Sequence, residues 1–261
     1  MVTTDTTVTG VDAVGDGGRG SRAKRCREAP NLILSVVNVE TAMVALDVHE
    51  DMQRLADSGV VAVMRGADAD TIIDVADALH EGGVTAYEIT ADNPDAMDLI
   101  REVSASFSDR EAIVGAGTVL DAPTANAAIQ AGAEFVVGPN FDEGVVETCN
   151  RYGTLVAPGI MTPTEAVDAY SAGADLVKVF PASSLGPGHL KSMKGPLPQI
   201  PMMPTGGVGL DNAADYVDAG AVVVGAGGAL MDGEAIENGD FEVITETARE
   251  FSNVIDDARD D

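Results

Sequence analysis

A strand-then-helix unit repeats from residue 60 to the end of the chain, and this repeat constrains the fold more than any other feature. Short runs rich in β-branched residues alternate with stretches of helical periodicity. Helix starts are marked too, since Asn93-Pro94 predicts an N-cap followed by proline and Thr162-Pro163-Thr164-Glu165 predicts a capping box. Strands are expected at 60–65, 86–90, 112–115, 135–138, 155–158, 176–180, 202–205 and 221–225.

Eight parallel strand–helix units in about 200 residues predict an α/β protein built as a (β/α)8 TIM barrel. An open, doubly wound sheet is the structural alternative. The nearly continuous apolar strands suit either fold, because both bury their strands on two faces. In a barrel the chemistry sits at the C-terminal ends of the strands, so residues that do not belong in a core are sought there.

The first 42 residues differ in composition from the rest of the chain. They carry five basic and five acidic residues, whereas residues 43–261 carry 10 basic and 38 acidic residues and therefore the whole net charge of −28. We expect a single barrel domain over 43–261, preceded by a disordered extension or by a start codon placed too early. Met43 and Met52 are the alternative starts. The apolar stretch 32–39 is short and interrupted, which disfavours a secretory signal.

The acidic charge excludes several kinds of partner. A nucleic-acid backbone and an anionic membrane surface would both be repelled. The sequence also contains no run of 18 apolar residues, the length needed to span a bilayer. The chain is also poor in lysine, with only Lys24, Lys178, Lys191 and Lys194. A lysine-poor, Asp/Glu-rich surface is typical of proteins in a cytoplasm of very high salt, where screening removes self-repulsion. An ordinary acidic protein is the alternative.

Two charged residues interrupt apolar strands. Lys178 lies within 176–180, and an amine held among apolar residues favours the neutral nucleophile needed to form a Schiff base. A lysine whose stem packs at a strand end is the alternative. Glu88 lies within 86–90, where a buried carboxylate needs a partner and suits general acid/base catalysis. A structural ion pair, including one with Lys178, is the alternative.

Glycine-rich elements are expected after three strands, at 115–118, 204–207 and 225–228. Glycines after the seventh and eighth strands let backbone N–H groups approach an anion, so they predict a phosphate site; tight turns are the alternative. No zinc spacing, catalytic triad or dinucleotide motif is present, so neither metal nor cofactor is expected. Cys149 shares an apolar helix face with Val145 and Val146 and is expected to be a core thiol.

Taken together, the motifs resemble the 2-keto-3-deoxy-6-phosphogluconate (KDPG) aldolase / 4-hydroxy-2-oxoglutarate (KHG) aldolase family over about residues 55–251. The resemblance implies a class I aldolase, an aldehyde-lyase, on a (β/α)8 barrel, assembled as a homotrimer and acting on an anionic 2-keto acid without metal or cofactor. The motifs that carry it are Val61-Ala62-Val63-Met64-Arg65, Glu88-Ile89-Thr90, Gly115-Ala116-Gly117-Thr118-Val119, Pro158-Gly159-Ile160-Met161-Thr162-Pro163-Thr164-Glu165, Lys178-Val179-Phe180-Pro181 and Pro204-Thr205-Gly206-Gly207-Val208.

By position, the resemblance makes Lys178 the Schiff-base lysine and Glu88 the proton shuttle. Substrate binding falls to Arg65, Thr90, Thr118, Pro139, Phe180 and Thr205, and phosphate binding to Gly206, Gly207, Gly227 and Gly228. Two positions depart from the family pattern: Asp92 stands where some members have arginine, and Gly228 where many have serine. Loss of the serine hydroxyl leaves the choice between phosphorylated and free substrates open.

The expected reaction is cleavage of KDPG to pyruvate and glyceraldehyde 3-phosphate in the cytoplasm. The alternative is an aldolase of the same fold with another substrate: 4-hydroxy-2-oxoglutarate, the galactonate epimer or an unphosphorylated 2-keto-3-deoxy sugar acid. A non-catalytic barrel that binds phosphate ligands is the alternative from another class. Because the body is acidic and the substrate anionic, we also expect Arg65, Lys178, Lys191 and Lys194 to gather near the site and make it locally positive.

Overall fold

A computed structural model describes residues 39–66, 68–108 and 112–260. They belong to one compact unit, 38–261, and the predicted (β/α)8 barrel is confirmed. The predicted disordered extension falls mostly on 1–38, outside the described residues, so the boundary at residue 42 and the alternative starts stay predictions.

Every strand pair is parallel, in two ladders that close into a barrel. The ladders run β5-β4-β3-β2-β1-β9 and β6-β7-β8. A bridge between Thr205 and Gly225 joins β8 to β9, and only Pro158 separates β5 from β6. Proline has no N–H for the ladder, which explains the break in the fifth barrel position. The strands are β1 Val60–Met64, β2 Ala86–Thr90, β3 Ile113–Gly117, β4 Phe135–Val137, β5 Leu155–Ala157, β6 Gly159–Ile160, β7 Val177–Val179, β8 Met202–Pro204 and β9 Val224–Ala226.

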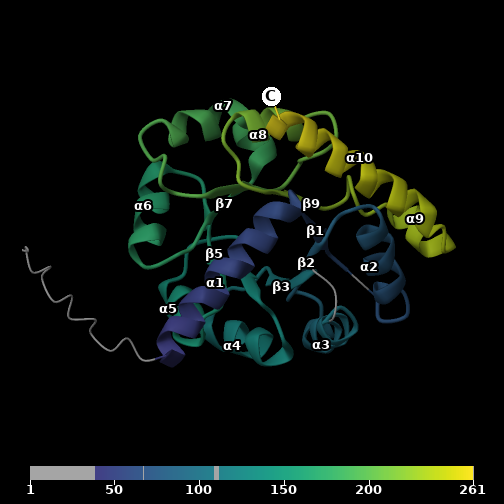
Figure 1. Cartoon of the computed structure of the whole chain (residues 1–261), viewed down its shortest axis with the longest axis horizontal. Helices are drawn as coiled ribbons and strands as arrows, with labels where there is room; N and C mark the ends of the chain where they lie inside the picture. Colours follow the sequence, from purple (N-terminus) through teal and green to yellow (C-terminus); the bar gives the residue numbers. More distant parts are fainter. Residues whose placement is uncertain (1–38, 67, 109–111, 261) are drawn as a thin grey trace, which may run out of the picture. The chain divides into compact units, whose positions relative to one another are not determined.

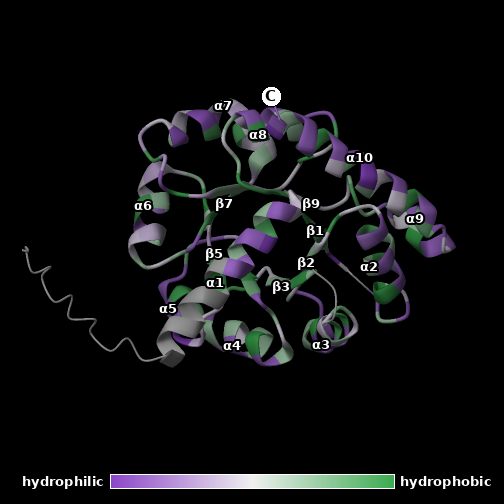
Figure 2. Ribbon diagram, viewed as in Figure 1, coloured by the Kyte–Doolittle hydropathy of each residue, from purple (hydrophilic) through white to green (hydrophobic). Residues whose placement is uncertain are grey.

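Helices surround the strands in a ring, and α1 crosses its centre (Figure 1). The ring helices alternate hydrophilic and hydrophobic colours, as amphipathic helices packed on a barrel do (Figure 2). None of the described helices is long and apolar enough to cross a membrane. The helices are α1 Val39–Ser58, α2 Ile72–Glu81, α3 Ala96–Ser106, α4 Ala122–Ala131, α5 Glu143–Tyr152, α6 Pro163–Ser171, α7 Ala182–Lys194, α8 Ala213–Asp218, α9 Gly233–Asn238 and α10 Phe241–Asp260.

Of the two helix starts that the sequence marks, one is confirmed. The capping box of Thr162 and Glu165 is confirmed at α6. The predicted cap at Asn93 is wrong, because α3 begins at Ala96 and has Asp95 as its N-cap. The Asn93 side chain instead accepts the Asp95 N–H at 3.0 Å, so the Asn-Pro pair forms a turn before the helix.

The inside of the barrel is apolar at the end where the strands begin. Ile113, Phe135 and Leu155 fill it, and Met52 and Leu55 of α1 pack against them. The outer faces of the strands form a second core with the ring helices. Cys149 of α5 lies in this outer core, and its burial raises the pKa of the thiol to about 12, as expected of a core cysteine. The polar interior residues are therefore left to the opposite end of the barrel.

Candidate active site

Lys178 lies in the middle of β7 with its side chain inside the barrel. Its register neighbours are Gly159 on β6 and Met203 on β8. The side chain is 6% exposed, and the Nζ atom lies 5.2 Å from the centre of the Phe180 ring. The lack of a side chain at Gly159 lets the backbone at Pro139 pack closely against β6, and the lysine amine points toward the cavity at the C-terminal end of the barrel.

Glu88 brings a carboxylate to the same point from the other side of the barrel. It lies on β2 between Val63 of β1 and Gly115 of β3, and its side chain is 1% exposed. Its Oε1 atom lies 3.9 Å from Lys178 Nζ. Neither carboxylate oxygen has a hydrogen-bond partner within the described residues. The two charged residues singled out in the sequence thus form a buried pair with unused hydrogen-bonding capacity.

The glycines of 115–117 make room for side chains inside the barrel, and Gly117 makes room for the Glu88 carboxylate. They were expected in a loop after the third strand, but that prediction is wrong because β3 runs on to Gly117. A Cβ atom at Gly115 would lie 2.5 Å from the Phe135 ring, and one at Gly117 would overlap the Glu88 carboxylate. Only glycine fits at these inward positions, because large side chains from neighbouring strands occupy the space.

Arg65 stands at the rim, where β1 ends. One terminal nitrogen pairs with Asp92 and the other donates to Thr118 Oγ1 at 3.1 Å. Thr118 has φ +57°, in the left-handed region that β-branched residues seldom enter. Asp92 entered the sequence analysis only as a departure from the family pattern. Its place just after β2, at the catalytic end of a strand, was the signal that could have marked it as a site residue.

A cavity of about 510 Å³ opens above the lysine. Lys178, Phe180 and Thr205 line it together with the loops after β8 and β9, and Arg65 stands at its edge. The predicted phosphate-binding glycines therefore border the same cavity as the lysine. Those glycines are Gly206, Gly207, Gly227 and Gly228.

The loop after β8 turns sharply through Gly206 and Gly207, whose φ angles are +90° and +82°. The Gly206 carbonyl accepts the Ser183 N–H at 2.8 Å, and the Gly207 carbonyl accepts Asn212 Nδ2 at 3.1 Å. The loop is thus tied down through its carbonyls. Ser183 and Asn212 support the site but follow no motif, so sequence reasoning missed them.

Two threonine hydroxyls are buried and unsatisfied near this end of the barrel. Thr90 on β2 and Thr205 after β8 are 0% and 5% exposed, and neither Oγ1 has a hydrogen-bond partner within the described residues. Buried hydroxyls normally find a partner. Thr205 lines the cavity and can serve a ligand bound there, whereas Thr90 is not among the lining residues. Pro139 follows β4, where its backbone lies against Gly159, and it is not among the residues that line the cavity.

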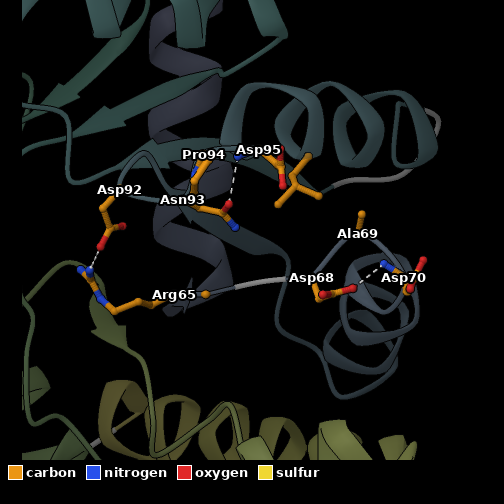
Figure 3. Close-up of a pocket in the computed structure, with 10 residues that line it drawn as sticks. Arg65, Asp68, Ala69, Asp70, Asp92, Asn93, Pro94 and Asp95 are labelled. Carbon is orange, nitrogen blue, oxygen red and sulfur yellow. Dashed lines mark hydrogen bonds and ion pairs between the residues drawn. The ribbon is translucent and has the colours of Figure 1, made fainter.

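A neighbouring cavity of about 620 Å³ shares Arg65 with the first (Figure 3). Four carboxylates border it: Asp68, Asp70, Asp92 and Asp95. Across the described part of the chain, no group of three or more His, Cys, Asp or Glu residues is arranged to hold a metal ion.

The expected gathering of lysines at the site is wrong for two of them. Lys191 and Lys194 lie in the last turn of α7, which leads back to the start of β8 at the opposite end of the barrel. Lys194 Nζ donates to the carbonyls of Pro198 and Ile200 there, at 3.1 Å each. Among the residues lining the cavity of about 510 Å³, which contains Lys178 and which we call the catalytic cavity in what we propose below, the cations are Arg65 and Lys178.

Comparisons with known proteins point to one family. Its model, described as KDPG and KHG aldolase, matches residues 51–247. The 2-dehydro-3-deoxy-6-phosphogalactonate aldolase of Escherichia coli (strain K12) is 34% identical over 180 residues, which are 68% of this chain and 87% of the relative. The 2-dehydro-3-deoxy-phosphogluconate aldolase of Pseudomonas aeruginosa is 37% identical over 192 residues, 73% and 85% of the two chains.

A solved structure shows the same similarity in three dimensions. The KDPG aldolase of Legionella pneumophila, with pyruvate captured at low pH as a covalent carbinolamine intermediate, superposes with a TM-score of 0.71 and 27% identity. The superposition covers 76% of this chain and 96% of that one.

Proposed function

Because the chain belongs to the KDPG and KHG aldolase family and is therefore an aldehyde-lyase, we propose that it cleaves KDPG to pyruvate and glyceraldehyde 3-phosphate through a Schiff base on Lys178. One observation carries the proposal. The Lys178 amine and the Glu88 carboxylate lie 3.9 Å apart, almost fully buried at the C-terminal end of the barrel. A nucleophilic amine next to a proton-transfer group is what imine chemistry requires.

In the first step, the neutral Lys178 amine attacks the C2 ketone of the substrate. A C–N bond forms, the nitrogen gives up one of its protons and the former carbonyl oxygen takes one up, which gives a neutral carbinolamine. Glu88 in its protonated form then donates a proton to that hydroxyl group, which leaves as water. The product is a protonated imine, and Glu88 is left as a carboxylate.

In the second step, the C3–C4 bond breaks. The Glu88 carboxylate accepts the proton of the C4 hydroxyl, directly or through a water molecule, as the C4 oxygen becomes an aldehyde oxygen. The electron pair of the broken bond moves toward the positively charged imine, which gives an enamine on Lys178. Both Glu88 oxygens lack a partner within the described residues, so either can accept the proton.

In the third step, glyceraldehyde 3-phosphate leaves, and Glu88 gives the proton that it took from the C4 hydroxyl to C3 of the enamine. Water then hydrolyses the protonated imine, which releases pyruvate and the neutral Lys178 amine, and the proton set free returns Glu88 to its protonated form. The water formed in the first step balances the water used here. The buried hydroxyls of Thr90 and Thr205 are the groups we expect to hydrogen-bond the substrate oxygens.

The two ends of the substrate would be held by different groups. Arg65 and Thr118 stand at the rim and suit the carboxylate, because guanidinium N–H groups match carboxylate oxygens. The carbonyls of the Gly206-Gly207 loop are engaged by Ser183 and Asn212, so its N–H groups are what it can offer a phosphate. The loop at Gly227 and Gly228 borders the same end of the cavity. Pro139 and Phe180 complete the predicted substrate-binding set.

Other 2-keto-3-deoxy acids are the second candidate substrates. The observation that favours them is Gly228, which supplies no hydroxyl to the phosphate end, together with similarity to a galactonate-type aldolase. The deciding test couples pyruvate release to a dehydrogenase and compares kcat/KM for KDPG, its galactonate epimer, the unphosphorylated acid and 4-hydroxy-2-oxoglutarate. The proposal predicts the highest kcat/KM for KDPG, and no pyruvate release from any of the four would contradict it.

We further propose that the chain works as a cytoplasmic homotrimer. Phosphorylated sugar acids do not cross membranes, so an enzyme that consumes them works where they are made. Apolar side chains on and before α6, Met161, Val167 and Tyr170, are all more than 40% exposed, which suits an interface between copies. Light scattering should give three times the monomer mass, and Val167→Asp should lower it. Val243→Asp, on the exposed face of α10, is the matched control.

A further inference from the structure

Arg65 is held from two sides by residues that follow neighbouring strands. Asp92 follows β2 and Thr118 follows β3, and each engages a different terminal nitrogen of the Arg65 guanidinium. A planar group fixed at two corners has a defined orientation, whereas one contact would let it rotate. The Arg65 and Asp92 side chains are 58% and 45% exposed, so water and substrate can reach the pair.

The contact with Thr118 coincides with backbone strain. Thr118 adopts φ +57°, a conformation that a β-branched residue enters only at a cost in free energy. In this conformation its hydroxyl accepts a hydrogen bond from Arg65. Strain of this kind persists where the surrounding structure fixes the residue. Thr118 therefore offers the Arg65 guanidinium a hydrogen-bond acceptor in a fixed position.

The acidic cavity offers Arg65 other partners. Asp68, Asp70 and Asp95 line it together with Arg65. In Figure 3 the Arg65 guanidinium extends toward Asp92 and away from Asp68 and Asp70. Asp92 thus supplies the carboxylate that keeps Arg65 on the side where Thr118 and the catalytic cavity lie.

We propose that Asp92 is a positioning residue, which orients Arg65 at the mouth of the catalytic cavity to receive the anionic end of the substrate. The inference rests on the proposed function, in which Arg65 binds that end. Asp92 is not among the residues that line the catalytic cavity, and its own negative charge repels the substrate. Its contribution is therefore orientation of Arg65, and it acts on substrate affinity rather than on bond cleavage.

The test is the steady-state cleavage of KDPG by Asp92→Ala and Asp92→Asn. Exposed ion pairs contribute modestly, so Asp92→Ala should raise KM by about three- to fivefold and leave kcat within about twofold. Asp92→Asn retains a hydrogen-bond acceptor and should stay within about twofold of wild-type KM. Asp98→Ala is the matched control, because Asp98 pairs with Arg101 on the exposed face of α3, and its KM should equal that of the wild type.

Three results would overturn the proposal: an unchanged KM in Asp92→Ala, an equal rise in Asp92→Asn, or a lower KM in both, which would make Asp92 a competitor of the substrate. The variant Arg65→Ala distinguishes failure of the positioning role of Asp92 from failure of the proposed function. If Arg65→Ala raises KM, adding Asp92→Ala to it should have no further effect, and an additive effect contradicts positioning. If Arg65→Ala leaves KM unchanged, the role of Arg65 in the proposed function is wrong.

Discussion

At Gly117, the absence of a side chain leaves the space that the Glu88 carboxylate occupies. A Cβ atom there would overlap the carboxylate, and the register of β2 and β3 fixes both backbones. The carboxylate would have to move, because neither strand can shift without breaking its ladder. The position of the proposed proton-transfer group thus depends on a residue that has no side chain.

Gly117→Ala should therefore lower kcat by about a hundredfold, since misplacing a catalytic group by about 1 Å can have that effect. Gly233→Ala is the control, because a Cβ atom there meets nothing within 4 Å. Circular dichroism should show that both variants are folded, and the pyruvate-release assay measures kcat. A Gly117→Ala enzyme with wild-type kcat would show that the carboxylate position is not needed.

Gly228 tests the phosphate end of the cavity. A Cβ atom added there also meets nothing within 4 Å, so a serine fits. If phosphate binds at this loop, Gly228→Ser adds a hydrogen bond to a charged group and should lower KM for KDPG by up to about tenfold. The KM for the unphosphorylated acid should not change. Equal effects on both substrates would place the phosphate elsewhere.

Individual residues were predictable where the sequence breaks a pattern. Lys178 and Glu88 stand out because a charge in an apolar strand needs a reason, and the structure brings the two together. Asp92 and Asn212 do not stand out, since they lie in loops where polar residues are ordinary. Their roles depend on which loops meet at the rim of the barrel, and no local pattern encodes that.

At the scale of elements, the start of α6 shows how a local signal is reinforced. The Glu165 carboxylate accepts the N–H groups of Met161 and Thr162, each at 2.8 Å, as well as the Thr162 hydroxyl. These bonds, that from Met161 first, hold the pKa of Glu165 below its ordinary value. The charged form is therefore favoured in the folded state and supports the helix start.

Because of this lowered pKa, the contribution of Glu165 to the stability of the fold should decrease as the pH falls. The contribution of Glu165 should be complete above the ordinary pKa of 4.5 and should disappear as the pH falls through the lower pKa of the folded state. Chemical unfolding of wild type and Glu165→Gln should show a stability difference near neutral pH that shrinks in acid. Glu250→Gln on α10 controls for the loss of a surface charge, and a difference that grows in acid would refute the prediction.

Element order was predictable because hydrophobic periodicity repeats, whereas element ends were less so. Strand β3 extends to Gly117, although glycines are disfavoured inside strands. Glycine is accommodated there because side chains from neighbouring strands fill the space that its own side chain would occupy. The break at Pro158 and the late start of α3 follow from backbone chemistry that a periodicity argument ignores.

At the scale of the whole molecule, residues 43–261 carry 10 basic and 38 acidic residues. Within the described residues, the catalytic cavity keeps two cations, Arg65 and Lys178. Lys191 and Lys194 instead belong to the opposite end of the barrel. Attraction of an anionic substrate is thus confined to the cavity, and the surrounding surface opposes it.

As KCl is raised from millimolar to molar concentration, the free energy of unfolding should therefore rise and KM for KDPG should fall. Screening at a Debye length of about 3 Å near 1 M removes the repulsion among surface carboxylates and between the surface and the substrate. Denaturant titrations and KDPG kinetics across this range measure the two effects. Insensitivity of both to KCl would contradict the salt-adapted interpretation of the charge.

The central claim is that Lys178 forms the covalent intermediate. Treatment with pyruvate and sodium borohydride should reduce the imine and fix a pyruvyl adduct, and peptide mapping can locate it readily because the chain has only four lysines. We predict that the adduct lies on Lys178 and that Lys178→Ala abolishes it. Glu88→Gln should still give the adduct, but more slowly because imine formation loses its proton donor, while cleavage of KDPG is lost. Labelling that survives unchanged in Lys178→Ala would contradict the account.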